Sequence, residues 1–191
     1  TGIEMAKGKY VYFVDSDDFI AMDAIGLLIE SILSHDADIA THGYVHYYDE
    51  GSDGIAYNFA NNTQSTLSNT DALEKLLYEE NVTTSACMKL YKRQLFGENI
   101  RFPLGKIYED LAIVYRLFAE ADKIVLNSVP KYYYYERVGS TTQRSFSSKR
   151  MDGLDIAKEQ LNFIDEKFPT LTAAAQYRLF AEAVYISMKM P

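Results

Sequence analysis

The feature that most constrains the fold is an uninterrupted apolar run at residues 10–14 that ends directly in the acidic tetrapeptide DSDD at residues 15–18. Such a run of β-branched and aromatic residues is typical of a strand buried on both faces. Clustered carboxylates after it place like charges at a sheet edge, where water, hydrogen bonds or a cation must offset their repulsion. In open α/β sheets, ligands bind at the carboxyl ends of strands. The pattern therefore predicts a site for a divalent cation and a diphosphate at Asp15 and Asp17.

A helix that follows this segment offers another explanation for the acids. Residues 21–35 carry an apolar stripe of helical spacing, formed by Ile25, Leu28, Ile29 and Ile32. Aspartate and serine are common in turns and at helix N-termini, where they cap backbone N–H groups. Because one aspartate is enough for a cap, three acids after an apolar strand favour the cation site, and the capping turn stays as the alternative.

Size and charge narrow the class of protein. The chain has 191 residues, of which 48% are hydrophobic, and this suits a single globular domain with a sizeable core. A net charge of −8 and a pI of about 4.9 argue against a nucleic-acid-binding protein, because such proteins rely on basic contacts to phosphate. An acidic protein can still bind an anionic nucleotide if a metal ion or a local basic group offsets the charge.

The cysteine content and the hydropathy pattern indicate the compartment. Cys87 is the single cysteine, so an internal disulfide is excluded and a reducing compartment is expected. It lies in an apolar run, where a buried and inert thiol is expected. No apolar stretch reaches transmembrane length and no signal peptide is recognisable. We expect a cytoplasmic protein, and association with the inner face of a membrane is left open.

The first residues resemble the end of a helix. Residues 3–7 are followed by Gly8, a common helix stop, and the predicted strand comes directly after it. In a parallel α/β domain such a helix follows an earlier strand. We therefore expect the chain to be a fragment that lacks one or more upstream βα units.

The rest of the chain alternates between strand and helix patterns, as in an α/β domain. Strands are predicted at residues 38–48, 55–59, 86–91, 123–127 and 131–138. Helices are predicted at residues 72–80, after a capping box that begins at Ser68, and at 109–121, with a helical turn at 92–96. Two amphipathic helices end the chain, with apolar stripes at Leu154, Ala157, Leu161, Ile164 and Phe168 and at Tyr177, Phe180, Val184 and Met188.

A second acidic motif, Glu109-Asp110, opens the predicted helix at residues 109–121. Acids at helix N-termini commonly do no more than interact with the helix dipole. A carboxylate there can also act as a general base that takes a proton from a hydroxyl group. The dipole lowers the pKa of such an acid and weakens it as a base, whereas burial raises the pKa. The sequence leaves this balance open.

Further polar and aromatic groups follow. Arg137 and the nearby Ser140 suit phosphate oxygens, and a solvated turn accounts for them equally well. Residues 132–135 are four consecutive tyrosines that point alternately to the two faces of a strand, and packing within the sheet is favoured over stacking on a sugar or base. His42 and His46 share a strand face, but without a third obvious ligand they are not assigned to a metal.

Four segments, taken in order, resemble family-2 glycosyltransferases, which are nucleotide-sugar enzymes with the GT-A fold that are common in bacterial polysaccharide synthesis. They are AKGKYVYFVDSDD at residues 6–18, MKLYKR at 88–93, IRFP with GKIYED at 100–110, and YYYYERVGST at 132–141. The resemblance implies an α/β fold class. It would comprise a partial GT-A domain with a mixed central sheet and flanking helices over residues 1–146, and a C-terminal helical extension over residues 147–191.

The resemblance also implies roles for the acids. DSDD looks like the DXD motif of the family, with Asp15 near the nucleotide ribose or the metal and Asp17 on a Mn²⁺ or Mg²⁺ ion that bridges the donor diphosphate. Asp18 would support them. Asp110 resembles the catalytic base of an inverting hexosyl transfer, and Glu109 would have a supporting or acceptor-binding role.

The late motif and the expected partners follow from the same resemblance. Arg137 and Ser140 match it, which implies a role at the diphosphate or in loop closure, and Lys89 is similarly placed without a defined role. The expected partners are a nucleotide-sugar donor, a UDP-sugar first of all, and a carbohydrate or lipid-linked glycan acceptor. Nucleic acid is not expected, and self-association and contact with a membrane surface are left open. Because the family's base-binding units do not precede Thr1, we expect this chain alone to bind nucleotide weakly and to be inactive.

Two alternatives remain. A phosphohydrolase of the haloacid dehalogenase type also ends a buried strand in D-x-D, but that family has Gly-Thr or similar after the second aspartate, where this chain has Asp18 and Phe19. A non-catalytic glycan- or partner-binding module derived from a transferase is the other alternative. The acids kept at both predicted sites count against it.

Overall fold

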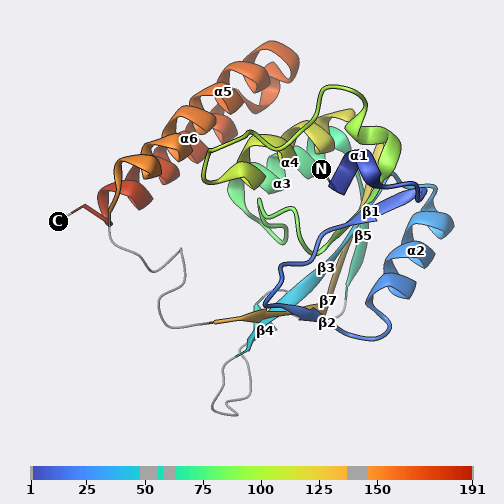
Figure 1. Cartoon of the computed structure of the whole chain (residues 1–191). Coiled ribbons are helices and arrows are strands. Elements are labelled where there is room, and N and C mark those ends of the chain that lie inside the picture. Colours follow the sequence, from blue (N-terminus) through green and yellow to red (C-terminus); the bar gives the residue numbers. More distant parts are fainter. Residues whose placement is uncertain (1, 48–55, 58–62, 137–145, 191) are drawn as a thin grey trace.

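The computed structural model describes residues 2–47, 56–57, 63–136 and 146–190. Its helices are α1 (Gly2–Met5), α2 (Ala24–His35), α3 (Asn69–Tyr78), α4 (Glu109–Glu120), α5 (Met151–Lys167) and α6 (Thr172–Ser187), with 3-10 turns η1 (Arg93–Phe96), η2 (Ser148–Arg150) and η3 (Pro169–Leu171). Its strands are β1 (Tyr10–Tyr12), β2 (Phe19–Ile20), β3 (Ile39–Tyr47), β4 (Ala56–Tyr57), β5 (Gln64–Ser68), β6 (Lys89–Lys92) and β7 (Lys123–Tyr135). Together they form one mixed α/β structure (Figure 1).

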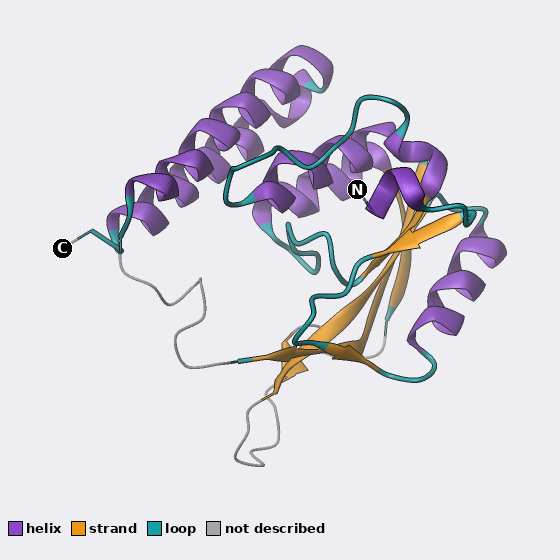
Figure 2. Ribbon diagram, viewed as in Figure 1, coloured by secondary structure: helices purple, strands orange, loops and turns teal. Residues whose placement is uncertain are grey.

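The described strands form one sheet in the order β1-β6-β3-β7-β2, with β4 paired to β3 and β5 paired to β7. The long central pair β3 and β7 is parallel, and the other pairs are antiparallel. Helix α2 covers one face, and α3 and α4 cover the other (Figure 2). The predicted mixed sheet with helices on both faces is therefore confirmed.

The first strand differs from its prediction. β1 ends at Tyr12, whereas the apolar run continues to Val14, whose side chain is 45% exposed. Among the described strands, β1 pairs only with β6 and so lies at the end of the sheet order. All three of its residues are half-buried, because an end strand has a neighbour on one side only. The prediction of a strand buried on both faces was wrong.

Other strands also differ from the predicted ones, because pairing with distant strands determines them. The two strands predicted at residues 123–127 and 131–138 are one continuous strand, β7. Its Pro130 faces Gly43 of β3, and the register of the pair shifts on both sides of that glycine, so the irregularity accommodates a residue that lacks an N–H group. Strands β2 and β5 were not predicted. Pairing of Phe19 and Ile20 with β7 delays the start of α2 to Ala24.

Local signals at helix ends were more reliable. The Ser68 side chain accepts a hydrogen bond from the Asp71 N–H group at 3.2 Å, so the predicted cap of α3 is confirmed. α5 ends at Lys167, and Pro169 begins the short turn η3, as a proline at that place predicts.

The C-terminal pair α5–α6 packs against the outer side of α3 and α4 (Figure 1). Ile164, Leu171, Ala174 and Ala175 of this pair and of the turn between its helices belong to the same apolar core that α3, α4 and the sheet form. A second core, centred on Leu28 and Ile32, lies under α2. In the described parts of the chain, no helix combines the length and the apolar character that crossing a membrane requires.

Candidate functional site

The acidic tetrapeptide forms the loop between β1 and β2, and Tyr132 of β7 holds that loop in place. The Tyr132 hydroxyl accepts a hydrogen bond from the Asp15 N–H group at 3.2 Å and donates one to Asp18 Oδ2 at 2.6 Å. The Tyr135 N–H group donates to Asp18 Oδ1 at 2.9 Å. Both carboxylate oxygens of Asp18 therefore anchor the loop to the sheet. The side chains of Asp15 and Asp17 are exposed.

The second pair of acids lies in the first turn of α4. Asp110 is half-buried and Glu109 is exposed. Asp110 Oδ2 accepts a hydrogen bond of 2.8 Å from the N–H group of Ala86, in the segment that leads into β6. This contact ties the start of α4 to the same end of the sheet that carries the acidic loop.

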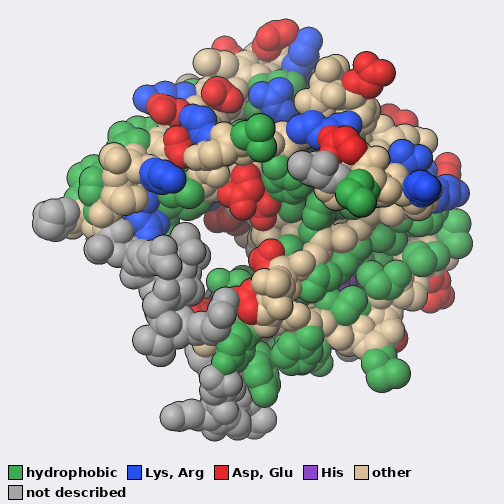
Figure 3. Space-filling view, viewed as in Figure 1, with side chains coloured by type: hydrophobic (Ala, Val, Ile, Leu, Met, Phe, Trp, Pro, Cys, Tyr) green, Lys and Arg blue, Asp and Glu red, His purple; other side chains and the backbone are tan. Residues whose placement is uncertain are grey.

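The structure brings the two acidic motifs together. Partial desolvation, followed by the charges of Asp18, Asp110, Asp17 and Glu109, raises the pKa of Asp15. Carboxylates influence one another in this way only at short range, so residues about 90 positions apart in sequence share one electrostatic site. Figure 3 shows acidic side chains gathered around a hollow in the middle of one face. The two acidic motifs are therefore neighbours in the structure, and the roles of the individual acids stay predictions.

The sequence left open whether the pKa of Asp110 is raised or lowered, and the structure gives the direction of the shift. Burial raises the pKa of Asp110, and the charge of Glu109 adds to this, while the hydrogen bond from Ala86 and the charge of Lys89 oppose it. The net shift is upward, so burial outweighs the stabilisation of the charged form. A carboxylate with a raised pKa is a stronger base toward a hydroxyl group.

Lys89 is a buried cation beneath the segment that contacts Asp110. Its ammonium group donates hydrogen bonds to the carbonyl oxygens of Ser85 at 2.6 Å and Cys87 at 3.4 Å, and to Thr83 Oγ1 at 3.4 Å. Burial lowers the pKa of Lys89 to about 8, while the charge of Asp110 acts in the opposite direction. In the sequence, Lys89 lies in a family segment but has no assigned role. In the structure, its ammonium group contacts the backbone on both sides of Ala86, the residue whose N–H group donates to Asp110.

Several other predictions concern residues around the site. Cys87 is buried, as predicted, and desolvation raises its pKa to about 11, which disfavours the reactive thiolate. His42 is also buried; desolvation lowers its pKa to about 4, and its ring contacts the Tyr12 hydroxyl and the Gly43 carbonyl oxygen at 2.9 and 2.8 Å. It is therefore neutral and structural near pH 7.

The sequence missed the role of Tyr132. A run of tyrosines predicts packing in a sheet, and Tyr132 does pack in it, fully buried. Strand alternation placed Tyr132 and Tyr134 on one face, but nothing in the sequence indicated that this face meets the acidic loop. Arg137 and Ser140 lie outside the described residues.

The donor set at the acidic loop fits a hard divalent cation. Carboxylate oxygens are the ligands that Mg²⁺ and Mn²⁺ prefer, and such ions are commonly held by one or two carboxylates together with substrate phosphates. Within the described residues, no three His, Cys, Asp or Glu side chains form a metal-binding group on their own. An ion on Asp15 and Asp17 would thus share its coordination with oxygens from a bound substrate or water.

The fold and the site agree with comparisons to known proteins. The structure of S. aureus TarS 1-349 in complex with UDP-GlcNAc superposes with a TM-score of 0.71 over 98% of this chain and 51% of that chain, at 20% sequence identity. This likeness shows a GT-A-like fold. The sequence model of Glycosyl transferase family 2 matches residues 1–99, just over half of the chain. The chain belongs to this glycosyltransferase family.

Curated relatives are consistent with this assignment. Glycosyltransferase GlyA of Streptococcus pneumoniae serotype 4 is 30% identical over 191 residues, which cover 95% of this chain and 27% of GlyA. The poly(ribitol-phosphate) beta-glucosyltransferase of Bacillus spizizenii is 31% identical over 134 residues, covering 69% of this chain and 20% of that protein. The chain spans less than two thirds of the length of each of these proteins. The family match also decides against the phosphohydrolase alternative.

Proposed function

We propose that the acidic site is the catalytic centre of a metal-dependent, inverting glycosyltransferase that moves a hexosyl group from a nucleotide-diphosphate sugar to an acceptor hydroxyl. The observation that carries the proposal is the electrostatic cluster that joins Asp15 and Asp17 to Glu109 and Asp110. Family membership supplies the reaction class. The two acidic motifs meet its two chemical requirements, which are a neutralised leaving group and a base for the acceptor.

On the donor side, Asp15 and Asp17 would hold Mn²⁺ or Mg²⁺. When bound, the ion supplies positive charge that stabilises the departing diphosphate. Asp18 keeps the loop in place through Tyr132 and the Tyr135 backbone. A UDP-sugar is the proposed donor, because the similar structure of TarS was determined in complex with UDP-GlcNAc.

On the acceptor side, Asp110 acts as the base. The acceptor O–H bond breaks and its proton moves to an oxygen of the Asp110 carboxylate, whose Oδ2 accepts a hydrogen bond from Ala86. The acceptor oxygen forms a bond to the anomeric carbon as the bond from that carbon to the diphosphate oxygen breaks with its electron pair. Attack opposite the leaving group inverts the configuration. Glu109 strengthens the base, because its charge raises the pKa of Asp110.

Arg137 and Ser140 are proposed to contact the diphosphate or to take part in closing a loop over it. The proposed acceptor is a hydroxyl group of a bacterial cell-surface polysaccharide or glycoconjugate. Polyol-phosphate polymers of the teichoic-acid type are included among the proposed acceptors, because one relative is named a poly(ribitol-phosphate) beta-glucosyltransferase. The retention of acids at both motifs favours a catalytic protein over a non-catalytic binding module.

Substitution of the two motifs in the full-length protein tests this function. Transfer from radiolabelled UDP-GlcNAc or UDP-glucose to poly(ribitol phosphate) and to a panel of glycan acceptors is measured with and without Mn²⁺. Asp110→Asn should lower kcat by a factor of about 10² to 10⁴, the usual contribution of a general base, which is far more than any change in the affinity for UDP and Mn²⁺. Asp17→Asn should abolish Mn²⁺-dependent transfer.

A matched control is Asp155→Asn, which removes an exposed acid of α5 that pairs with Lys158 at 3.7 Å. Full kcat in Asp110→Asn would remove that residue as the base, and transfer unaffected by excess chelator would remove the metal from the proposal. Calorimetry with UDP and Mn²⁺ on the 191-residue chain tests the separate prediction that it binds nucleotide weakly by itself.

A further inference from the structure

We propose that the start of the C-terminal helical pair is a positioning element for the base, with Arg150 and Asp152 holding the segment that carries Glu109 and Asp110. This inference rests on the proposed function, because it treats Asp110 as the base. It gives a role in catalysis to residues 147–191, which the resemblance left without one.

Three consecutive residues before the acid pair dock on the start of α5. The Lys106 ammonium group pairs with Asp152 Oδ1 at 3.3 Å, and the Ile107 N–H group donates to Asp152 Oδ2 at 3.3 Å. Arg150 donates a hydrogen bond of 2.7 Å from Nη1 to the Tyr108 hydroxyl. The position of the segment is thus set by residues about 45 positions further along the chain.

The backbone of Tyr108 shows why such anchoring is needed. Tyr108 has φ 62° and ψ 35°, the left-handed conformation that costs a bulky L-residue about 1–2 kcal/mol. It precedes Glu109 directly, and its side chain makes no capping hydrogen bond to α4. A strained residue at a helix start persists only when its surroundings determine its geometry.

Close packing against α5 fixes the geometry of Tyr108. Gly153 is buried, and a Cβ atom added there would lie 3.0 Å from Tyr108 Cδ2 and would collide with Glu182 Oε1. The ring of Tyr108 therefore rests directly against the backbone of α5, between Arg150 and Gly153. A helix start in this tight contact can shift only if the C-terminal pair shifts with it.

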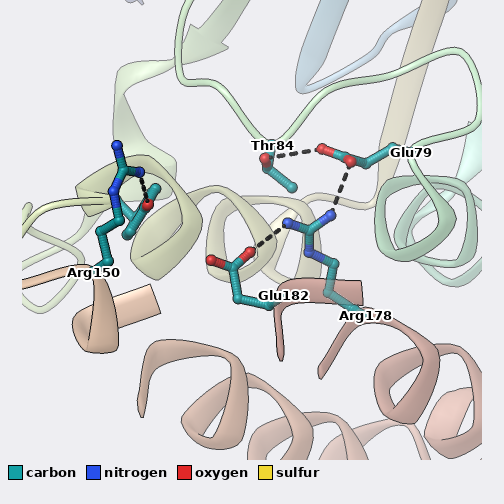
Figure 4. Close-up of polar contacts among 6 residues, drawn as sticks. Glu79, Thr84, Arg150, Arg178 and Glu182 are labelled. Atoms are coloured by element: carbon teal, nitrogen blue, oxygen red, sulfur yellow. Dashed lines mark hydrogen bonds and ion pairs between the residues drawn. The ribbon is translucent and has the colours of Figure 1, made fainter. Parts of the chain in front are cut away.

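A second set of contacts connects α6 to the residues before β6, which include the Ala86 N–H group that donates to Asp110. Arg178 of α6 bridges Glu182 at 3.0 Å and Glu79 at 2.8 Å, and Thr84 Oγ1 donates to Glu79 Oε1 at 3.2 Å (Figure 4). Two residues after Thr84, the N–H group of Ala86 donates to Asp110. Asp110 is in this way connected to the start of α5 through residues 106–108 and to α6 through Glu79, Thr84 and Ala86.

The test uses two variants that cut the contacts while keeping the core. Asp152→Ala removes both bonds to residues 106 and 107 from a partly exposed position, and Tyr108→Phe removes only the hydroxyl that Arg150 contacts. The matched control is Asp155→Ala, which removes an acid of the same helix whose ion pair is to Lys158. All are made in the full-length protein.

Hydrogen–deuterium exchange is measured first, because it needs no substrate. Amides of residues 104–112 should exchange faster in both variants than in the wild type and in Asp155→Ala. In transfer from UDP-GlcNAc with Mn²⁺, kcat should fall about 10-fold, in the range that a small displacement of a reacting group produces, while KM for the donor and the affinity for UDP stay within 2-fold. A merely structural role would lower donor affinity and kcat together.

Unchanged exchange in residues 104–112 overturns the proposal, as does wild-type kcat in both variants or an equal loss in Asp155→Ala. The failure of the proposed function is recognised separately. If Asp110→Asn keeps full kcat, the base is assigned to the wrong residue, whereas loss in Asp110→Asn with full activity in Asp152→Ala and Tyr108→Phe refutes only the positioning role.

Discussion

Lys89→Met changes the buried cation behind the proposed base, and its effect can be worked out from the structure. Lys89 is 1% exposed and burial lowers its pKa to about 8, whereas an unfolded lysine has a pKa of about 10.4. Each pKa unit corresponds to about 1.4 kcal/mol, so keeping Lys89 charged costs the folded state about 3 kcal/mol at pH 7. The cost is complete below pH 8 and is relieved as the pH rises from 8 to 10.4, because the unfolded chain then binds more protons.

The measured quantity is the free energy of unfolding, from urea denaturation at pH 7, 8 and 9. Integrated over this interval, the relief at Lys89 amounts to about 1 kcal/mol and is missing in Lys89→Met. The free energy of the wild type minus that of the variant should therefore rise by about 1 kcal/mol between pH 7 and pH 9. The neighbouring Cys87, whose pKa burial raises to about 11, also affects stability in this range, but it is present in both proteins and its contribution cancels in the difference.

Lys158→Met, which removes an exposed lysine of α5, controls for the loss of a lysine charge without the burial cost. A difference between wild type and Lys89→Met that is independent of pH would refute the reasoning, because Lys89 would then be hydrated and the carbonyl cradle at Ser85 and Cys87 would be open in solution. The same variant affects catalysis. Since the charge of Lys89 lowers the pKa of Asp110, its removal should move the acidic limb of the kcat profile to higher pH.

Two further substitutions test the loop anchor and the contact with α5. Tyr132→Phe leaves Asp18 Oδ2 and the Asp15 N–H group without their partner, which should cost about 1–3 kcal/mol of stability and weaken UDP binding in the presence of Mn²⁺. The control is Tyr133→Phe, in which the ring stacked on Phe19 remains. Equal UDP affinities of the two variants in calorimetry would contradict the anchoring role of Tyr132. Gly153→Ala should lower the free energy of unfolding, measured by urea denaturation, by about 1–2 kcal/mol. The cost of overpacking against Glu182 and Tyr108 exceeds the gain in helix propensity of about 1 kcal/mol. An increase in stability would show that α5 can move away from these side chains.

Signals that act over a few residues predicted the local parts of the site. The acids at residues 15–18 and 109–110 were found because a charged motif follows or opens a regular element, and this can be recognised within one short window. The capping box at Ser68 and the helix stop at Pro169 depend on equally short contacts. The order of the four segments then indicated the family and its mixed sheet, although no single segment would have done so.

Features set by distant partners could not be predicted in the same way. The apolar run at residues 10–14 indicates a strand, but its place at the end of the sheet depends on β6, about 80 residues later. The continuity of β7 past Pro130 depends on Gly43 of its parallel partner. The anchoring of the acidic loop by Tyr132 requires the pairing of β2 with β7. Each depends on which elements become neighbours, and the composition of one segment carries no information about that.

The pKa values of Asp15 and Asp110 are both raised, and burial is the largest cause of each shift, but the smaller causes differ. The pKa of Asp15 is raised by partial desolvation and by four neighbouring carboxylates, and the repulsive part of that shift would be reversed by a cation. The pKa of Asp110 is raised chiefly by burial, which persists when charges are neutralised at the solvent-exposed end of the site. A bound cation would thus relieve repulsion at the loop, while burial would still raise the pKa of the half-buried Asp110. An acidic site with this asymmetry suits a reaction in which one side must stabilise a leaving anion and the other must accept a proton.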